Sequence, residues 1–372
     1  MFAAMSISIA VTRRALLAGG LIVAAAPAFA RSSAHAPVID GLSFLPERMA
    51  EIGEAGLDAM ICDVSQVEEV RDADGTPRYR RGFTVNDAAI DAAVARIATS
   101  NGTYLALKGS DVGARPGCAT FLQFQSCEML EGDPARLARF HAKGLRVLQF
   151  THHNSNAFAG GAIEREPGGL TALGLDTLSE MNRLRIVPDV SHGSDQTMLD
   201  AARASTRPII LSHGAARAIV NHPRCAPDTV IRAIAERGGM MGVFMMSFWL
   251  TRAPVPRVEH LVANLAHVIG VGGIDAVGIA NDFPMAGEAA LVKLRNDNRE
   301  GVKNYLGWWT AMRRLGIPGF KWTPRHVVIP ELNRIDRMTR IRNALAAARF
   351  KPREIDKIMG GNWARVLTDV LG

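Results

Sequence analysis

Cysteine is scarce in this sequence, and no two cysteines have the spacing of a metal or redox motif. The 372 residues contain four cysteines and no CxxC, which argues against a structural zinc motif and against a dithiol redox site. Cys118 and Cys127 flank the strand-like stretch 120–124. An extended chain of that length holds their Cα atoms much further apart than the roughly 5.5 Å of a disulfide. We therefore predict no disulfide between these two residues.

Concentrated charge and aromatic residues are lacking as well. Lys and Arg number 43 against 36 Asp and Glu, a net charge of +7, and aromatic residues make up only 6%. No stretch interleaves basic with aromatic side chains, so we expect no nucleic-acid partner. Hydrophobic residues at 48% and charged residues at 21% are typical of a folded protein and exclude wholesale disorder.

Long hydrophobic runs are absent beyond the N-terminus. Arg13 and Arg14 precede an apolar run that ends at Ala26, and a small-x-small sequence ends at Ala30. This order is typical of a cleaved export signal, and the paired arginines indicate the twin-arginine route. The run is shorter than the roughly 20 residues of a membrane span; a retained anchor is the alternative. We predict a signal peptide at 1–30, a periplasmic location, and one domain at 31–372 without a further membrane span.

Short apolar runs alternate with longer amphipathic stretches in that domain. Eight runs resemble buried parallel strands, at 37–39, 59–62, 121–124, 147–150, 186–188, 208–211, 241–244 and 277–279. Amphipathic stretches lie at 134–143, 171–184, 196–204 and 228–237. The alternation predicts an α/β fold, a TIM-like (β/α)8 barrel. An open doubly wound sheet is the alternative, but no glycine-rich phosphate motif follows the first run.

Two further stretches do not fit the eight repeated units. Residues 104–107 form a ninth run, which we predict to be an extra short strand in a connection. Residues 285–330, with several Gly and Pro, are predicted to be an elaborated loop after the last strand.

Polar residues follow four of the predicted strands. They are His152 and His153 after the fourth run, His192 after the fifth, His213 after the sixth and Asp282 after the eighth. The carboxyl ends of barrel strands meet at one face, which carries function. One histidine there is commonly structural, but histidines after three successive strands favour a metal site or acid–base chemistry. A metal-assisted hydrolase is the predicted class.

Six segments carry a resemblance to a known family. They lie at 170–184, 189–192, 212–217, 224–228, 278–283 and 360–366. In these segments the sequence resembles the membrane (renal) dipeptidase family, peptidase family M19, and the similarity runs in order from about Val38 to the C-terminus. The resemblance implies a barrel of the metal-dependent hydrolase type, a small peptide-like substrate and, as in many members, a homodimer. It also implies zinc, of which the family binds two ions.

Matched residue by residue, the resemblance implies that part of the family site is present. His192 and His213 match the two histidines of the second zinc. His152 and Arg224 match substrate-binding residues, and His152 also assists catalysis. Asp282 matches the carboxylate that handles the proton.

The other zinc ligands of the family have no counterpart. The family's first strand ends in Asp-Gly-His-Asn-Asp, whereas residues 40–44 read DGLSF, with Leu42 and Phe44 at the ligand positions. Gln125 stands where the family has a bridging glutamate, and a neutral amide is a weaker ligand than a carboxylate. We therefore predict a degraded metal site that holds at most one zinc, through His192, His213 and the Gln125 amide.

Other residues offer alternatives for the missing ligands. Lys108 aligns with the bridging glutamate in a second alignment, Cys127 would be a ligand as a thiolate, and Glu128 or Asp282 would replace a lost carboxylate. For Cys127, a small buried hydrophobic residue is the favoured interpretation over a ligand. Two functions follow: a one-zinc hydrolase of a dipeptide or peptide-like molecule, or a metal-poor periplasmic protein that binds or tailors such a molecule, for example in siderophore maturation, without dipeptidase activity.

Overall fold

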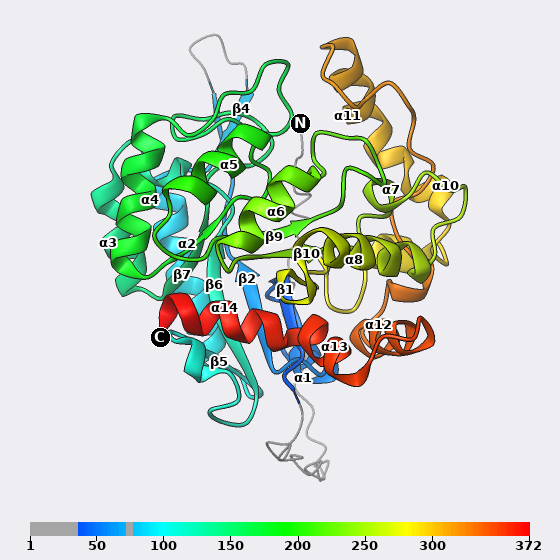
Figure 1. Cartoon of the computed structure of the whole chain (residues 1–372). Coiled ribbons are helices and arrows are strands. Elements are labelled where there is room, and N and C mark those ends of the chain that lie inside the picture. Colours follow the sequence, from blue (N-terminus) through cyan, green and yellow to red (C-terminus); the bar gives the residue numbers. More distant parts are fainter. Residues whose placement is uncertain (1–35, 72–76) are drawn as a thin grey trace, which may run out of the picture.

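Eight parallel strands form the centre of the computed structural model, which describes residues 36–71 and 77–372 (Figure 1). In spatial order they are β1 (Ile39–Phe44), β2 (Ala59–Asp63), β6 (Cys118–Phe124), β7 (Leu145–Gln149), β8 (Val187–Asp189), β9 (Ile210–Gly214), β10 (Met240–Val243) and β11 (Val277–Ile279). Each predicted run corresponds to one of them, so the predicted barrel is confirmed. The first run was placed too early, since β1 continues to Phe44. The predicted signal peptide lies outside the described residues.

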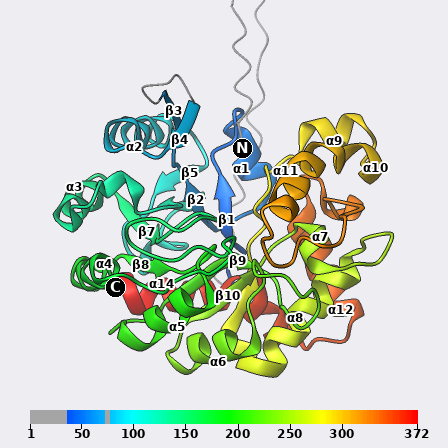
Figure 2. The same cartoon turned by 90° about the horizontal axis from the view of Figure 1, so that it is seen from above.

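The first and last strands, β1 and β11, lie beside each other and nearly close the barrel. Figure 2 shows this barrel from above, with its helices on the outside. The Asp282 N–H donates to the Leu42 carbonyl at 3.0 Å. The Asp40 carboxylate accepts 2.8 Å hydrogen bonds from the backbone N–H and from the side-chain amide of Asn281. The Asp40 side chain therefore helps to join β1 to β11, whereas the other neighbouring strands of the barrel are joined by backbone hydrogen bonds.

Helices surround the strands. They include α1 (Ala50–Glu54), α2 (Phe83–Ala98), α3 (Leu137–Ala142), α4 (Ala172–Leu184), α5 (Asp195–Ala204), α6 (Asp228–Glu236) and α8 (Val258–Gly272). The four predicted amphipathic stretches correspond to α3 through α6. Thr171 and Ser194 begin α4 and α5, because their hydroxyls accept from backbone N–H groups that the first helical turn leaves without partners. Among the described residues, no helix is long and apolar enough to cross a membrane.

The end of the barrel at which its strands begin is closed by the C-terminal helix α14 (Asn362–Leu371), preceded by α13 (Pro352–Asp356). Trp363 is fully buried, and its indole N–H donates to the Ile279 carbonyl at 2.9 Å. A Cβ on Gly41, Gly242 or Gly278 would lie within 3 Å of the indole. These glycines are required because the indole occupies the space of their side chains.

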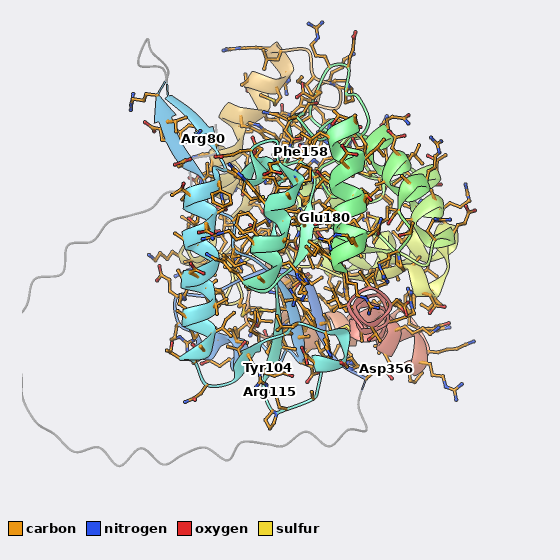
Figure 3. The ribbon with its side chains drawn as sticks, turned by 90° about the vertical axis from the view of Figure 1, so that its left-hand side faces the viewer. Arg80, Tyr104, Arg115, Phe158, Glu180 and Asp356 are labelled. Carbon is orange, nitrogen blue, oxygen red and sulfur yellow. The ribbon has the colours of Figure 1, made fainter. Side chains whose placement is uncertain are left out.

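Two insertions leave the regular pattern. β5 (Thr103–Leu105) pairs with the start of β6, which confirms the predicted extra strand. In Figure 3, Tyr104 of β5 lies beside Arg115, at the opposite end of the molecule from Arg80. The hairpin of β3 (Glu68–Arg71) and β4 (Pro77–Arg80) was not predicted. β3 is polar and has no buried residue, so it lacks the apolar run on which strand prediction depends.

The region after β11 contains more structure than the predicted loop. It holds α9 (Ala289–Lys293), α10 (Asn298–Gly301) and α11 (Lys303–Arg314), followed by α12 (Arg337–Ala347). The short helix α7 (Ser247–Leu250) follows β10. Trp308 of α11 packs 5.8 Å, centroid to centroid, from the His153 ring. The segment therefore contributes a wall to the end of the barrel at which the histidines lie.

All four cysteines are free and buried, which agrees with the prediction that Cys118 and Cys127 form no disulfide.

Candidate active site

Four histidines from three consecutive strand ends contact one another. The His192 Nε2 lies 2.7 Å from the His213 Nε2, and the His192 Nδ1 lies 3.0 Å from the His153 Nδ1. The His152 ring stacks on the His192 ring at 4.3 Å. The structure thus brings together the four histidines that follow the predicted strands, including His153, to which the sequence analysis gave no individual role.

A buried network holds this cluster from below. The His213 Nδ1 lies 2.8 Å from the Ser212 Oγ, and that hydroxyl donates to Asp189 at 2.5 Å. Asp189 also accepts from Gln123 and from the backbone N–H of Ser191. Groups that bond the far nitrogen of a histidine fix its tautomer and ring orientation. Asp189 and Ser212 therefore support the site by orienting His213. Both lie in segments named in the sequence analysis, but the sequence does not show which side chains they contact.

Three site residues have a left-handed backbone that non-glycine residues seldom adopt. The φ angles are 64° at His153, 63° at His192 and 54° at Asp282. Such conformations persist only where the surroundings enforce them, and they cluster at functional sites.

The imidazoles of the cluster are neutral. Burial holds the pKa of His152, His153, His192 and His213 well below the usual value, and the positive charge of Arg224 lowers each pKa further. Arg81, which follows the β3–β4 hairpin, adds to this effect at His152 and His153. Neutral imidazoles are the form that binds a metal or accepts a proton.

Arg224 lies buried beneath the cluster. Its two terminal nitrogens donate to the His213 carbonyl at 3.2 Å, its Nε has no partner, and its guanidinium lies 5.2 Å from the Phe244 ring centre. Within the described residues no carboxylate forms an ion pair with it. Burial lowers its pKa to about 10, so it remains charged at neutral pH. A buried cation with an unused donor suits an anionic substrate group.

Asp282 follows β11 and is only partly exposed. Burial raises the pKa of its carboxyl to about 7, Arg224 acts in the opposite direction, and Asp63 and Asp40 add to the rise. A carboxyl with a pKa near neutrality can both take and release a proton.

Gln125 lies at the end of β6, where its side-chain amide donates to Asp63 at 3.1 Å. Its backbone N–H donates to the Ser65 hydroxyl at 2.8 Å. These two bonds join it to β2 and the loop after it, and its carbonyl accepts from the Gln149 amide of β7 at 3.1 Å. The expectation that its amide helps to bind zinc remains a prediction.

Two of the alternative metal ligands considered from the sequence, Lys108 and Cys127, are excluded by their positions in the fold. Lys108 is exposed beside the 3-10 turn Gly109–Asp111, which packs on α14 at the opposite end of the barrel. Cys127 is fully buried in the apolar core, and burial raises the pKa of its thiol well above the usual value. It is a small core residue rather than a thiolate. Glu128 instead accepts from the Ser126 hydroxyl at 3.1 Å.

The donor set fits a metal ion. Ligand atoms of His152, His153 and His192 all lie within 4.8 Å of one another, so this group could hold an ion. Two imidazole nitrogens on one tetrahedral zinc lie about 3.4 Å apart, given bonds of roughly 2.1 Å. The His192 and His213 nitrogens would need to separate by less than 1 Å to reach that spacing. At the end of β1, Leu42 and Phe44 have no ligand atoms.

Eight parallel strands in a barrel, with clustered neutral imidazoles, an arginine and a carboxyl at their carboxyl ends, are typical of the barrel class to which metal-dependent hydrolases belong. A family model described as membrane dipeptidase (peptidase family M19) matches residues 107–299. The chain belongs to this family.

Relatives agree with this assignment. Dipeptidase tcpJ from Claviceps purpurea is 33% identical over 206 residues, which are 54% of this chain and 46% of that protein. The match therefore spans less than half of the relative. An amidohydrolase structure from Pseudomonas aeruginosa aligns with a TM-score of 0.73 at 24% identity, over 91% of this chain and 97% of that one.

A metallo peptidase from Rhodobacter sphaeroides, liganded with a phosphinate mimic of the dipeptide L-Ala-D-Ala, aligns with a TM-score of 0.69 at 18% identity, over 90% of this chain and 99% of that one. These two structures share the barrel fold.

Proposed function

We propose that this protein is an exported hydrolase of dipeptides or dipeptide-like small molecules, and that it works with at most one zinc ion. The observation that carries the proposal is the convergence of four neutral histidines, Arg224 and Asp282 at one end of the barrel. Family membership and the dipeptide mimic held by the Rhodobacter protein support the substrate class.

The single ion would be held by His192 and His213, with His152 or His153 within reach. When bound, zinc supplies Lewis-acid activation of water and of the scissile carbonyl. Leu42, Phe44 and Gln125 offer neither an imidazole nor a carboxylate for a second ion. Because one ion gives less charge stabilisation than two, and each 1.4 kcal/mol lost is about tenfold in rate, we expect slow hydrolysis of ordinary dipeptides.

The side chains divide the remaining work. Arg224 binds the substrate carboxylate through its guanidinium, and thereby positions the peptide bond. Asp282 accepts the proton of the attacking water and passes it to the leaving amine. His152 donates a hydrogen bond to the oxygen on which negative charge develops.

A second function is favoured by the hydrogen bonds within the cluster. His153, His192, His213, Ser212 and Asp189 form a continuous chain of partners. Imidazoles that satisfy one another in this way form a stable site without an ion, which would suit a protein that binds or tailors a peptide-like molecule.

The deciding experiment measures zinc by elemental analysis and L-Ala-D-Ala hydrolysis in long incubations, both with purified residues 31–372. The hydrolase proposal expects up to one zinc per chain and a slow rate that His192→Ala abolishes. His267→Ala is the control, because His267 lies away from the cluster and bonds Asp228. Two tightly held zinc ions would refute the one-ion site. Neither zinc nor hydrolysis, with calorimetric binding of the dipeptide, would favour the second function.

A further inference from the structure

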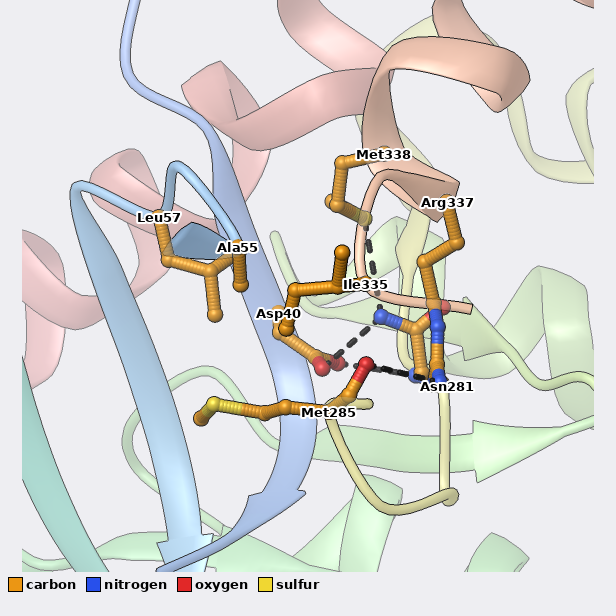
Figure 4. Close-up of a pocket in the computed structure, with 8 residues that line it drawn as sticks. All are labelled: Asp40, Ala55, Leu57, Asn281, Met285, Ile335, Arg337 and Met338. Carbon is orange, nitrogen blue, oxygen red and sulfur yellow. Dashed lines mark hydrogen bonds between the residues drawn. The ribbon is translucent and has the colours of Figure 1, made fainter. Parts of the chain in front are cut away.

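A buried polar cluster lies beside the seam between β1 and β11, outside the histidine site. Figure 4 shows Asp40, Asn281 and Arg337 around a cavity of about 10 Å³. All three side chains are at most 3% exposed. Such groups are costly to bury unless their hydrogen bonds are used, and here these bonds hold the chain on both sides of Asp282.

Asp40 holds the residue immediately before Asp282. Its carboxylate accepts from the backbone N–H and the side-chain amide of Asn281, each at 2.8 Å, and from the Leu42 N–H at 3.3 Å. A single carboxylate thus fixes both the backbone and the side chain of Asn281 against β1.

Arg337, the first residue of α12, holds the residues immediately after Asp282. Its terminal nitrogens donate to the carbonyls of Phe283 at 3.4 Å and Met285 at 3.1 Å, and to that of Pro284. Its Nε donates to Arg334 at 3.0 Å. Only a planar group with several fixed donors can bond consecutive carbonyls in this way.

Asp282 itself sits between these two attachments in a strained conformation. Its φ of 54° is left-handed, and its N–H donates to the Leu42 carbonyl. The flanking bonds enforce a backbone that an aspartate seldom adopts unaided.

Asp40 and Arg337 each favour the charged form of the other, but this attraction acts without a direct contact between their charged atoms. Within the described residues, Asp40 and Arg337 form no ion pair with each other, although a direct pair would best offset the cost of burying both. Each uses most of its hydrogen bonds on the 281–285 segment instead.

We propose that Asp40 and Arg337 are positioning residues, a clamp that fixes the segment 281–285 from both sides and so holds the Asp282 carboxylate at the site. The clamp rests on the proposed role of Asp282 in hydrolysis. It assigns a purpose to Asp40 on a strand whose last residues carry no metal ligand.

The test compares Arg337→Gln with Arg340→Gln, a control on the same helix that removes only an ion pair of Asp336. We expect Arg337→Gln to lower kcat for dipeptide hydrolysis at least tenfold while KM changes less than threefold and zinc content stays the same. Amide exchange in residues 280–287 should accelerate at least tenfold. Arg337→Lys keeps the charge without the fork, so we expect it to recover little of the lost kcat.

Asp40→Asn tests the other side of the clamp and replaces Arg337→Gln if that variant does not fold. Three outcomes would overturn the clamp. They are a folded variant whose kcat is unchanged, a folded variant whose amide exchange in this segment is unchanged, and an Arg337→Lys variant with the full kcat of the wild type. A wild-type protein without hydrolysis would refute the proposed function instead, while faster exchange in Arg337→Gln would still support the clamp.

Discussion

At the scale of single residues, the site is governed by burial. The desolvation that keeps four imidazoles neutral also raises the pKa of Asp282. It lowers the pKa of Arg224 only to about 10, so the guanidinium stays charged at neutral pH, and no carboxylate in the described part of the chain pairs with it. Each group is therefore in the state that the proposed hydrolysis requires: neutral imidazoles for a metal ion, a cation for the substrate carboxylate, and a carboxyl that exchanges protons near neutral pH.

Asp282→Asn should lower kcat at least a hundredfold with little change in KM, because it removes the proton acceptor and keeps the size of the side chain. Wild-type activity should rise with pH through about 7 as the carboxyl loses its proton, and this limb should vanish from any residual activity of the variant. Rates from pH 5 to 9 check both points.

The same group makes stability depend on pH. Its pKa is raised on folding, so the folded chain binds the proton more tightly and Asp282 costs stability as pH rises from about 4 to 7. Urea unfolding of the variant should therefore depend less on pH in this range. A kcat close to that of the wild type would remove Asp282 from the mechanism.

Arg224→Met should raise KM for dipeptides about tenfold to a hundredfold, since the substrate carboxylate loses its charged partner. Stability should stay the same or increase, because a buried charge without a carboxylate partner is replaced by an apolar chain of similar length. Kinetics and thermal melting measure the two effects. Arg252→Met, which removes an exposed guanidinium, is the control, and an unchanged KM in Arg224→Met would contradict the assignment.

At the scale of elements, chemistry depends on where each strand ends. β7, β8 and β9 deliver their histidines to one point, whereas β1 and β6 end in residues that supply neither imidazole nor carboxylate. Leu42 is fully buried in the apolar interior, in the same cluster as Trp363. β1 serves here as a packing strand and, through Asp40, as the partner of β11.

The combined change Leu42→His, Phe44→Asp and Gln125→Glu should raise the zinc content from at most one toward two per chain, because it restores two carboxylates and an imidazole. Dipeptide hydrolysis should increase if the supporting hydrogen bonds suit both ions. Placing an imidazole at the buried Leu42 position should also cost about 2 kcal/mol or more. Elemental analysis of the triple variant measures the zinc, with the single variant Gln125→Glu as the control. A zinc content no higher than that of the wild type would show that the alignment of these strands is wrong.

At the scale of the whole molecule, the barrel has two closures. The Asp40–Asn281 bonds close its side, and α14 closes the end opposite the site, where Trp363 fills the space between three glycines. The insertions follow the same division, since β5 lies near α14 and α11 lies beside the histidines.

Trp363→Ala should lower the free energy of unfolding by about 3–5 kcal/mol, the usual cost of truncating a fully buried tryptophan. Urea denaturation measures this loss. Trp308→Ala is the matched control: Trp308 is only partly buried against the core and should affect dipeptide binding more than stability. Equal stability losses in the two variants would contradict the role of Trp363 as the closing residue.

Export concerns the whole chain and remains a proposal. Arg13→Lys combined with Arg14→Lys should leave the precursor in the cytoplasm, because the twin-arginine route depends on both guanidinium groups. Cell fractionation and immunoblotting follow the precursor and the mature form. Normal delivery of the double variant to the periplasm would exclude this route.

The eight strands, their parallel arrangement, the family and the histidines at three strand ends could all be predicted from the amino-acid sequence. These features depend on short-range patterns: apolar runs of strand length, helical spacing between them, and the residue that follows each strand. Whatever runs against those patterns was missed, including the polar β3–β4 hairpin and the helices within 285–330.

Contacts between groups far apart in the sequence became visible only once the chain was folded. Asp40 and Asn281 are 241 residues apart and bond because the barrel closes. His153 reaches His192 because its own left-handed backbone turns the chain toward β8. Trp308 contacts His153 because α11 packs beside the histidines. The alternatives Lys108 and Cys127 were excluded by position and burial. Contacts of this kind arise from the summed geometry of the closed barrel, and no local pattern encodes them.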